Sequence, residues 1–344
     1  MYRFECDYTE GAHPKIIEAL AATNLEQTVG YGEDGHCENA RRLIREACQA
    51  PEMDVHFLVG GTQANTTVIA AILRPWQGAV CADTGHIACH ETGAIEASGH
   101  KVLPIPTRDG KITAEQVRAL VEAHFADATH EHQVQPGMVY ISHPTEGGLL
   151  YTKAELEALR AVCDEKGLPL FLDGARLGYG LAADGTDVTL PDLARLCDVF
   201  YIGGTKVGAL FGEAVVILND AFKADFRSLA KQRGALLAKG RLLGLQFDTL
   251  FTDDLYGRIS RHAIDMAMRM KALFRKYGVQ LAIDSPTNQQ FVILTPEQQQ
   301  QLAKSIVFEV WEQRPDKQLV CRFVTSWATS DEDLNTLEKA LANG

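Results

Sequence analysis

The sequence predicts an α/β protein in which a large, mostly parallel sheet is followed by a smaller C-terminal α+β unit. From about residue 55 onward, short β-rich runs alternate with helical stretches, and this alternation is typical of a parallel sheet with helices on both faces. The chain has 344 residues, enough for a large domain and a smaller one. We expect a large domain over residues 1–254, which includes an N-terminal arm at 1–20, and a small domain over 255–344.

The expected strands of the large sheet are continuous apolar runs, as in strands that are buried on both faces. They lie at residues 55–59, 79–82, 101–105, 138–141, 170–172 and 199–202. The helical patterns between them lie at 64–73, 92–97, 113–126, 153–165 and 191–196. Another strand at 214–218 follows after only eleven residues, which leaves no room for a crossover helix. We therefore expect this strand to run antiparallel to its neighbour.

The last third of the chain has a different pattern. Residues 220–276 are predicted to be helical, with a break at 252–254. The strands expected after it lie at 279–283, 291–294 and 320–324, and the helices at 296–304 and 331–342. This combination of strands and helices predicts a small α+β domain that starts near residue 255.

Composition excludes several classes of protein. Hydrophobic residues make up 46% and charged residues 23% of the chain, so a disordered, collagen-like or coiled-coil protein is excluded. The net charge of −12 disfavours nucleic acid and anionic membranes as partners. The eight cysteines form no C-x-x-C pair, which indicates reduced thiols. Residues 1–7 lack the apolar core of a signal peptide, and no apolar run approaches the roughly 18 residues that cross a bilayer. We expect a cytoplasmic protein.

The strongest chemical signal is a pair of residues at the ends of two strands. Asp173 directly follows the run 170–172, and Lys206 follows the run 199–202 through Gly-Gly-Thr. The carboxyl ends of parallel strands form the edge where ligands bind, so these side chains can meet around one small molecule. Pyridoxal phosphate needs such a pair: a lysine amine joins its aldehyde, and an aspartate keeps its ring nitrogen protonated. Taken singly, each residue is as well explained by a turn or a helix cap.

Two further segments project from the same edge. Gly60-Gly61-Thr62-Gln63-Ala64-Asn65 links the first strand to a helix, where backbone amides and the helix N-terminus can bind a phosphate. It matches neither the dinucleotide G-x-G-x-x-G pattern nor a P-loop, although an ordinary strand-to-helix turn also explains it. His86 follows the second strand and could lie against a flat ring. His86, Cys89 and His90 are close in sequence, but no further ligand completes a metal set, so we expect no metal site.

Arginines matter if the ligand is an amino acid, because the guanidinium group binds a carboxylate through two hydrogen bonds. Arg176 lies three residues after Asp173, and Arg322 lies on an expected strand of the small domain. Both are candidates for the substrate carboxylate. The alternative for each is a surface or interface ion pair, and Arg176 is the better candidate.

These segments together resemble the threonine aldolase branch of the β-eliminating lyase family. The landmarks are Asp7-Tyr8-Thr9-Glu10-Gly11-Ala12-His13-Pro14, Gly30-Tyr31-Gly32-Glu33-Asp34, Gly60 to Asn65, Gly85-His86-Ile87, Asp173-Gly174-Ala175-Arg176-Leu177, Gly204-Thr205-Lys206 and Arg322-Phe323-Val324-Thr325. They occur in the order of the family and cover essentially the whole chain. The resemblance implies the aspartate aminotransferase type of fold, which is pyridoxal phosphate fold type I, and a homo-oligomer, either a dimer or a tetramer.

The resemblance also implies roles for single residues. Lys206 would hold pyridoxal phosphate, Asp173 would face the ring nitrogen, and His86 would stack on the ring. The remaining implied contacts are Gly61, Thr62, Gln63, Thr205 and Arg176 to the cofactor, and Cys6, Tyr31, Arg176 and Arg322 to the substrate. Cys6 replaces a serine that is common in the family, and the family's Asn-Thr-His element is replaced by Ser142-His143-Pro144-Thr145-Glu146.

The implied activity is cleavage of L-threonine, L-allo-threonine and related L-3-hydroxy-α-amino acids to glycine and an aldehyde. The base that takes the hydroxyl proton is either His86 or a water that His86 orients, and the sequence does not choose between them. Another pyridoxal phosphate enzyme, either a β-eliminating lyase or an aminotransferase acting on another small amino acid, is the main alternative. A non-catalytic protein with this fold and a nicotinamide dehydrogenase are the remaining ones, and the latter lacks the dinucleotide pattern.

Overall fold

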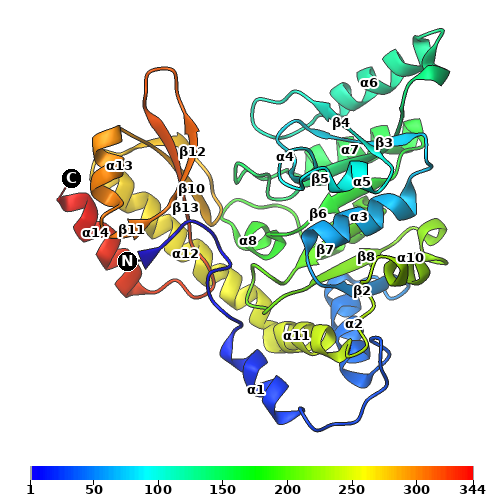
Figure 1. Ribbon diagram of the computed structural model, residues 1–344, viewed down its shortest axis with the longest axis horizontal. Coiled ribbons are helices and arrows are strands. Elements are labelled where there is room, and N and C mark those ends of the chain that lie inside the picture. Colours follow the sequence, from blue (N-terminus) through cyan, green and yellow to red (C-terminus); the bar gives the residue numbers. More distant parts are fainter. Residues whose placement is uncertain (1, 344) are drawn as a thin grey trace.

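The computed structural model describes residues 2–343 and contains a large unit and a smaller C-terminal unit side by side (Figure 1). The large unit is built on a seven-stranded sheet with strand order β2-β8-β7-β6-β5-β3-β4. These strands are β2 (Asp54–Leu58), β8 (Glu213–Ile217), β7 (Val199–Gly203), β6 (Leu170–Asp173), β5 (Gln135–Ser142), β3 (Gln77–Ala82) and β4 (Lys101–Ile105). Strand β8 is antiparallel to both of its neighbours, as predicted, and the other strand pairs are parallel.

Helices cover both faces of this sheet. They are α1 (Pro14–Ala22), α2 (Gly35–Cys48), α3 (Gly61–Ile72), α4 (His86–Cys89), α5 (Ala94–Ala97), α6 (Ala114–Ala126), α7 (Lys153–Lys166), α8 (Leu177–Ala182), α9 (Leu190–Leu196), α10 (Phe226–Gln232) and α11 (Arg241–Phe251). The strand period of two sends Leu170 and Leu172 of β6 into one core and Phe171 into another. All three side chains are fully buried, which explains why the central strands are apolar at every position.

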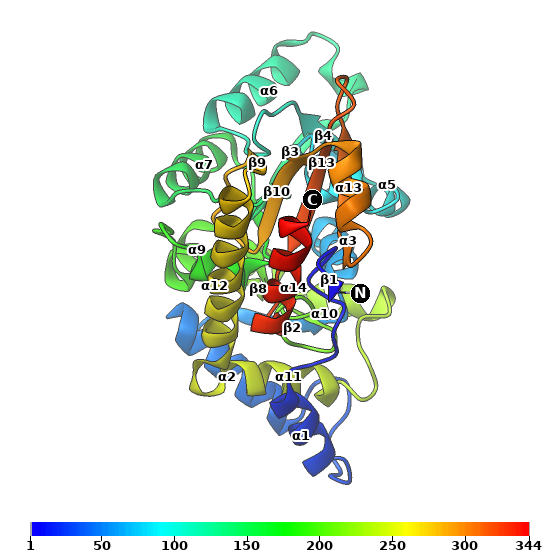
Figure 2. The same ribbon diagram turned by 90° about the vertical axis from the view of Figure 1, so that its left-hand side faces the viewer.

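The smaller unit contains a four-stranded antiparallel sheet with strand order β12-β13-β10-β9. The strands are β9 (Gln280–Ile283), β10 (Gln289–Leu294), β12 (Glu309–Gln313) and β13 (Leu319–Val324), and the helices are α12 (Leu255–Lys276), α13 (Pro296–Leu302) and α14 (Asp331–Ala342). Helices α12 and α14 lie over one face of this sheet (Figure 2). Helix α12 starts where the sequence predicts a break and also packs against α8 of the large unit. Whether residue 254 ends an independently folding domain stays a prediction.

The N-terminal segment links the two units. Strand β1 (Tyr2–Arg3) pairs in parallel with β11 (Ile306–Val307), and Phe4 lies in the apolar core of the smaller unit. The chain then passes the large sheet and enters α1, which extends from the bottom of the molecule in Figure 1. Residues 5–13 therefore run along the boundary between the units, close to the carboxyl ends of the parallel strands.

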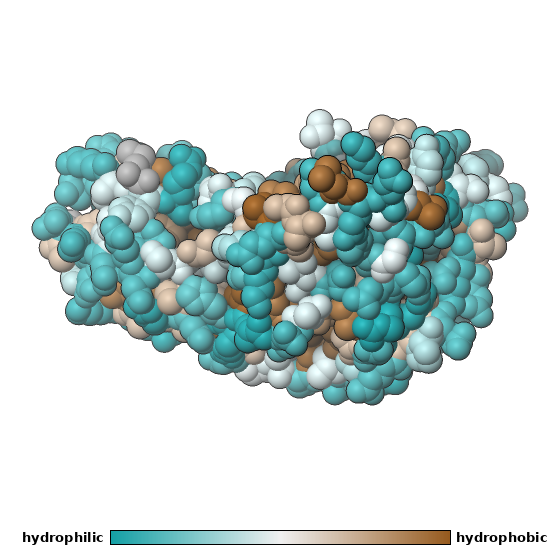
Figure 3. Space-filling view, turned by 90° about the horizontal axis from the view of Figure 1, so that it is seen from below, coloured by the Kyte–Doolittle hydropathy of each residue, from teal (hydrophilic) through white to brown (hydrophobic). Residues whose placement is uncertain are grey.

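The surface is mostly hydrophilic, with separate apolar patches on the face seen from below (Figure 3). Among residues 2–343, no helix is long and apolar enough to cross a membrane. No group of three or more His, Cys, Asp or Glu side chains in this range is placed to hold a metal ion.

Candidate active site

A cavity of about 290 Å³ lies at the carboxyl edge of the large sheet. It brings together seven residues that the sequence analysis selected: Gly61, Thr62, His86, Asp173, Arg176, Thr205 and Lys206. It also contains side chains that were not selected, namely Tyr8, Ser142, Glu146, Tyr201 and Glu213. The strand topology explains why these residues lie together, because the loops that follow β2, β3, β5, β6 and β7 all leave the sheet at one edge.

Asp173 is the last residue of β6 and is held by a shell of hydrogen-bond donors. The hydroxyls of Tyr140 and Tyr201 each donate to its carboxylate over 2.5 Å. The backbone N–H of Ala175 and the side-chain amide of Asn65 donate over 3.0 Å each. Burial raises the pKa of Asp173, but the charge of His86 and the tyrosine hydrogen bonds outweigh burial and bring it below its usual value. Asp173 is therefore a buried, ionised carboxylate.

Lys206 follows β7 and is half-buried in the same cavity as Arg176. Burial and the positive charge of Arg176 lower the pKa of its ammonium group, which favours the neutral, nucleophilic amine. The hydroxyl of Tyr179 donates to the Lys206 carbonyl over 2.6 Å and so fixes the backbone that carries the amine. Next to this backbone, Glu213 of β8 accepts a hydrogen bond from the Gly204 N–H over 3.0 Å. Burial raises the pKa of Glu213 to about 8, which favours its protonated form.

The N-terminus of α3 closes another side of the cavity. Gly60, the N-cap residue, supplies no side-chain acceptor for the first-turn amides, and a Cβ at this position would meet open space. The unpaired N–H groups and the helix dipole make this a site for an anion. Gln63 is turned away: its side chain accepts from Val59 N–H and donates to the Arg233 carbonyl, and it does not line the cavity. Its predicted phosphate contact is thus not supported by its side-chain position.

A buried polar chain orients His86. Its Nδ1 lies 2.8 Å from Oε1 of Glu91, and the same oxygen accepts a hydrogen bond from the Asn65 amide over 2.6 Å. Asn65 in turn reaches Asp173, so one chain of contacts connects the imidazole to the buried carboxylate. Burial lowers the pKa of His86, but the hydrogen bond that its ring donates to Glu91 and the charges of Asp173 and Glu146 outweigh burial and raise the pKa. Neither Glu91 nor Asn65 was selected from the sequence.

Arg176 is held by a partner from the N-terminal segment. Its Nε and Nη2 donate to the two carboxylate oxygens of Asp7 over 2.7 and 3.1 Å, and both side chains are buried. Asn288 of the smaller unit also donates to Asp7, over 2.9 Å. Neither of these bonds uses Nη1 of Arg176, so this nitrogen remains for a ligand in the cavity.

Comparison with known proteins identifies the family of this chain. The model of the β-eliminating lyase family matches residues 4–294. The chain belongs to the β-eliminating lyase family. It is 30% identical over 296 residues to a low specificity L-threonine aldolase of Pseudomonas aeruginosa, which covers 85% of this chain and 84% of that protein.

Comparison with solved structures shows which fold this family member has. A structure of Leishmania major threonine aldolase matches with a TM-score of 0.97 and 45% identity, covering 100% of this chain and 99% of that chain. Aspartate aminotransferase from Thermus thermophilus matches with a TM-score of 0.69 at 16% identity, covering 97% and 89%, respectively. The predictions of the family and of the aspartate aminotransferase type of fold are thereby confirmed.

Three predicted substrate contacts of this β-eliminating lyase family member do not line the cavity. Arg322 of β13 donates to Gln289 over 3.0 Å, pairs with Glu309 and stacks on a tryptophan. The thiol of Cys6 is half-buried, and Tyr31 is largely exposed, with Lys231 Nζ lying 4.5 Å from the centre of its ring. The structure thus gathers the predicted cofactor residues apart from Gln63, but of the four predicted substrate residues it gathers only Arg176.

Glu146 is the residue that sequence reasoning missed at the centre of the site. It follows β5 in the loop 143–146 and lines the cavity together with Ser142, whose hydroxyl donates to its carboxylate over 3.1 Å. Its position after a strand that ends at the binding edge is the same signal that identified Asp173 and Lys206. His143, by contrast, is fully buried away from the cavity, and burial lowers its pKa to about 4.

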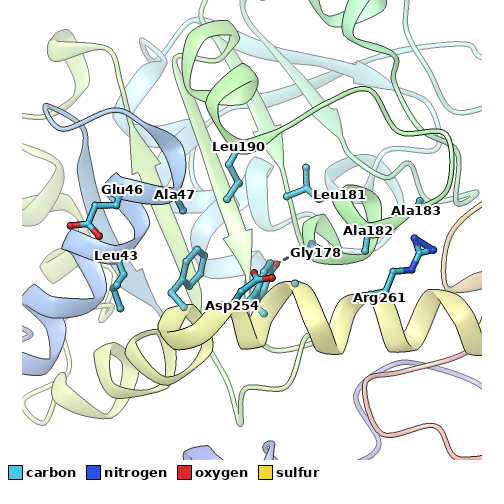
Figure 4. Close-up of a pocket in the computed structure, with 13 residues that line it drawn as sticks. Leu43, Glu46, Ala47, Gly178, Leu181, Ala182, Ala183, Leu190, Asp254 and Arg261 are labelled. Atoms are coloured by element: carbon cyan, nitrogen blue, oxygen red, sulfur yellow. Dashed lines mark hydrogen bonds between the residues drawn. The ribbon is translucent and has the colours of Figure 1, made fainter.

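A second cavity, of about 660 Å³, lies where α2, α8, α9 and α12 meet (Figure 4). Most of its labelled lining is apolar or small, as with Leu43, Leu181 and Leu190, and Asp254 and Arg261 lie on α12 or at its start. Tyr256, also part of this lining, uses its hydroxyl to bridge Gly178 N–H and the Gly203 carbonyl. The hydroxyl of Tyr256 therefore joins α8 to the end of β7 and has a structural role.

Proposed function

We propose that the chain is a pyridoxal-phosphate-dependent aldolase. It cleaves L-threonine, L-allo-threonine and related L-3-hydroxy-α-amino acids to glycine and an aldehyde. The observation that carries the proposal is one cavity that contains the Lys206 amine, the Asp173 carboxylate and the open N-terminus of α3. The relatives named as threonine aldolases support the same choice of reaction.

The residues of the cavity fit this cofactor. The amine of Lys206 has a lowered pKa and would hold the aldehyde carbon. Asp173 is ionised despite its burial and would keep a proton on the ring nitrogen. The amides of Gly61 and Thr62 would bind the phosphate, and Thr205 lines the same cavity. His86 would lie against the ring, held in place by Glu91.

When bound, pyridoxal phosphate supplies an electron sink for the pair released from a bond to the substrate α-carbon. The protein decides which bond is cleaved, because it orients the substrate. We propose that Nη1 of Arg176 binds the substrate carboxylate, while Asp7 and Asn288 fix the guanidinium plane. A carboxylate anchored in this way would restrict which bond of the α-carbon is aligned for cleavage, and such positioning contributes to the rate.

We also propose that the enzyme is a homo-oligomer in the cytoplasm. Tyr31 and Lys231 contact each other outside the cavity of their own chain, on a surface that includes other exposed apolar side chains. This contact supports the proposal that Tyr31 and the basic segment 231–241 reach into the site of a neighbouring subunit. All eight cysteines are free, which supports a reducing compartment.

Two measurements test the reaction. Borohydride reduction of the protein loaded with pyridoxal phosphate, followed by mass spectrometry, should find a pyridoxyl group on Lys206. L-threonine should yield acetaldehyde and glycine, and the variant Lys206→Ala should lose both the adduct and the products. Lys304→Ala, which changes an exposed lysine of the smaller unit, serves as the control. Absence of the adduct overturns the cofactor, and pyruvate from L-cysteine without acetaldehyde from L-threonine would support the β-eliminating lyase alternative.

A further inference from the structure

Cleavage of a 3-hydroxy amino acid needs a group that accepts the β-hydroxyl proton. The sequence leaves this base open between His86 and a water. The cavity adds candidates, because three carboxyl groups line it: those of Asp173, Glu213 and Glu146. The surroundings of each group decide which of them can accept a proton from the substrate.

His86 is poorly suited to be this base. Its Nδ1 is engaged with the buried carboxylate of Glu91, and three negative charges surround the ring. This environment favours an imidazole that already carries a proton on both nitrogens. In addition, a ring that stacks on a flat cofactor presents its face, and not a lone pair, to the reacting centre.

Asp173 and Glu213 have other functions. Asp173 accepts four hydrogen bonds from the protein and lies at the deep end of the site, where the proposed ring nitrogen would face it. Glu213 is buried next to the Lys206 backbone and accepts from Gly204 N–H. Burial also raises the pKa of Glu213, which favours the form that already holds its proton and cannot accept another.

Glu146 is the remaining candidate, and its surroundings are suitable for a general base. The Ser142 hydroxyl is its single side-chain hydrogen-bond donor among residues 2–343, which leaves acceptor sites on the carboxylate for a substrate hydroxyl. The Gln289 amide donates to the Glu146 carbonyl over 3.4 Å and so ties this loop to β10. Glu146 lines the same cavity as the cations His86, Arg176 and Lys206, and its charge acts to raise the pKa of each of them.

We infer that Glu146 is the catalytic base that accepts the β-hydroxyl proton, an assignment that rests on the proposed function. As the proton moves from the hydroxyl oxygen to a Glu146 oxygen, the O–H electron pair becomes the second C–O bond of the aldehyde. The Cα–Cβ bond breaks, and its electron pair leaves with the α-carbon fragment. That carbon then takes up one proton to become glycine, so the products contain all atoms of the substrate.

The variant Glu146→Gln tests this role, because it keeps the size and polarity of the side chain and removes only its basicity. We expect kcat for acetaldehyde release from L-threonine to fall by about 10²- to 10⁴-fold, the usual contribution of a general base. Exchange of the glycine α-hydrogen with D₂O, followed by NMR, should continue at the wild-type rate, because glycine has no β-hydroxyl. Binding of pyridoxal phosphate, measured by absorbance, should also be unchanged.

The pH profile gives a second readout. Wild-type kcat/KM should fall at acid pH as Glu146 is protonated, and Glu146→Gln should lack this decrease. The other charged groups that line the cavity with Glu146 are His86, Asp173, Arg176, Lys206 and Glu213, and none of them changes in the variant. Glu157→Gln, on the exposed side of α7, is the matched control and should behave as the wild type.

The outcomes separate this role from the alternatives. Wild-type cleavage by Glu146→Gln, together with a loss in Glu91→Gln, would move the base to His86 and overturn the assignment. Parallel loss of cleavage and of glycine exchange in Glu146→Gln would show a structural role and would also overturn it. A wild-type protein that loads pyridoxal phosphate but neither exchanges glycine nor cleaves L-threonine overturns the proposed function itself.

Discussion

At the scale of single residues, the ion pair between Asp7 and Arg176 has the clearest energetic consequence. Both side chains are buried, and Asn288 donates a third hydrogen bond into the pair. Burial raises the pKa of Asp7, but the charges of Arg176 and Lys206 and two hydrogen bonds outweigh it, so that its pKa lies below the usual value. A buried pair that loses one partner leaves an uncompensated charge.

We therefore expect Asp7→Asn to lower the free energy of unfolding by about 3 to 5 kcal/mol at pH 7, as measured with urea. A carboxylate with a lowered folded-state pKa stabilises the fold above its ordinary pKa and loses this effect as the pH falls. The difference in the free energy of unfolding between wild type and variant should therefore decrease below about pH 4. Glu18→Gln, an exposed change on α1, is the control. A gap that stays constant down to acid pH would contradict the ionised pair.

The same residues show what could be predicted from the sequence. Asp173 and Lys206 were found because each directly follows an apolar strand, and the carboxyl ends of parallel strands meet. The partnership of Asp7 with Arg176 joins residues 169 positions apart through a segment without regular structure, so no local pattern indicates it. Glu146 follows the same rule as Asp173, but the resemblance implies no carboxylate in this loop, because the family has an Asn-Thr-His element there.

At the scale of elements, the expected strands of the large sheet were confirmed and the helices before residue 55 were missed. The buried stripe of α2 consists of Cys37, Ala40, Ile44 and Cys48, and small residues give only a weak apolar signal. In α1 only Ile16 is buried. Strand β12 was missed for a related reason, because no residue in it is fully buried. These elements depend on tertiary contacts that a local pattern does not contain.

The small residues of α2 allow α11 to approach closely, and this leads to a prediction. A Cβ on Gly244 of α11 would lie 2.3 Å from the Sγ and 2.5 Å from the Cα of Cys37. Gly244→Ala should therefore lower the free energy of unfolding by about 1 to 3 kcal/mol, although alanine favours helices. Gly35→Ala is the matched control, because a Cβ at this first residue of α2 meets open space. Thermal unfolding of both variants measures the difference, and equal midpoints would contradict the contact.

At the scale of the whole molecule, the site lies where the large sheet, the N-terminal segment and the smaller unit meet. The sequence predicts both units but not their contact, because Asn288 and Gln289 reach the site only after the smaller unit has packed on the large one. The two-unit architecture thus places Arg176, which we propose to bind the substrate carboxylate, against Asp7 of the N-terminal segment, and Asp7 is in turn held by Asn288 of the smaller unit.

The surface of α1 and of the loop that follows it predicts how copies of the chain associate. Leu25 is 91% exposed, and Val29, Ile17 and Tyr31 are also exposed, which is unusual for side chains of this size in one region. If this region contacts a second copy, Leu25→Glu should reduce the mass measured by light scattering and also lower aldolase activity, because Tyr31 would no longer reach the neighbouring site. Phe125→Glu, on α6 at the opposite end of the molecule (Figure 1), should change neither quantity. A Leu25→Glu protein of wild-type mass would exclude this region as the interface and would leave Tyr31 without a role in catalysis.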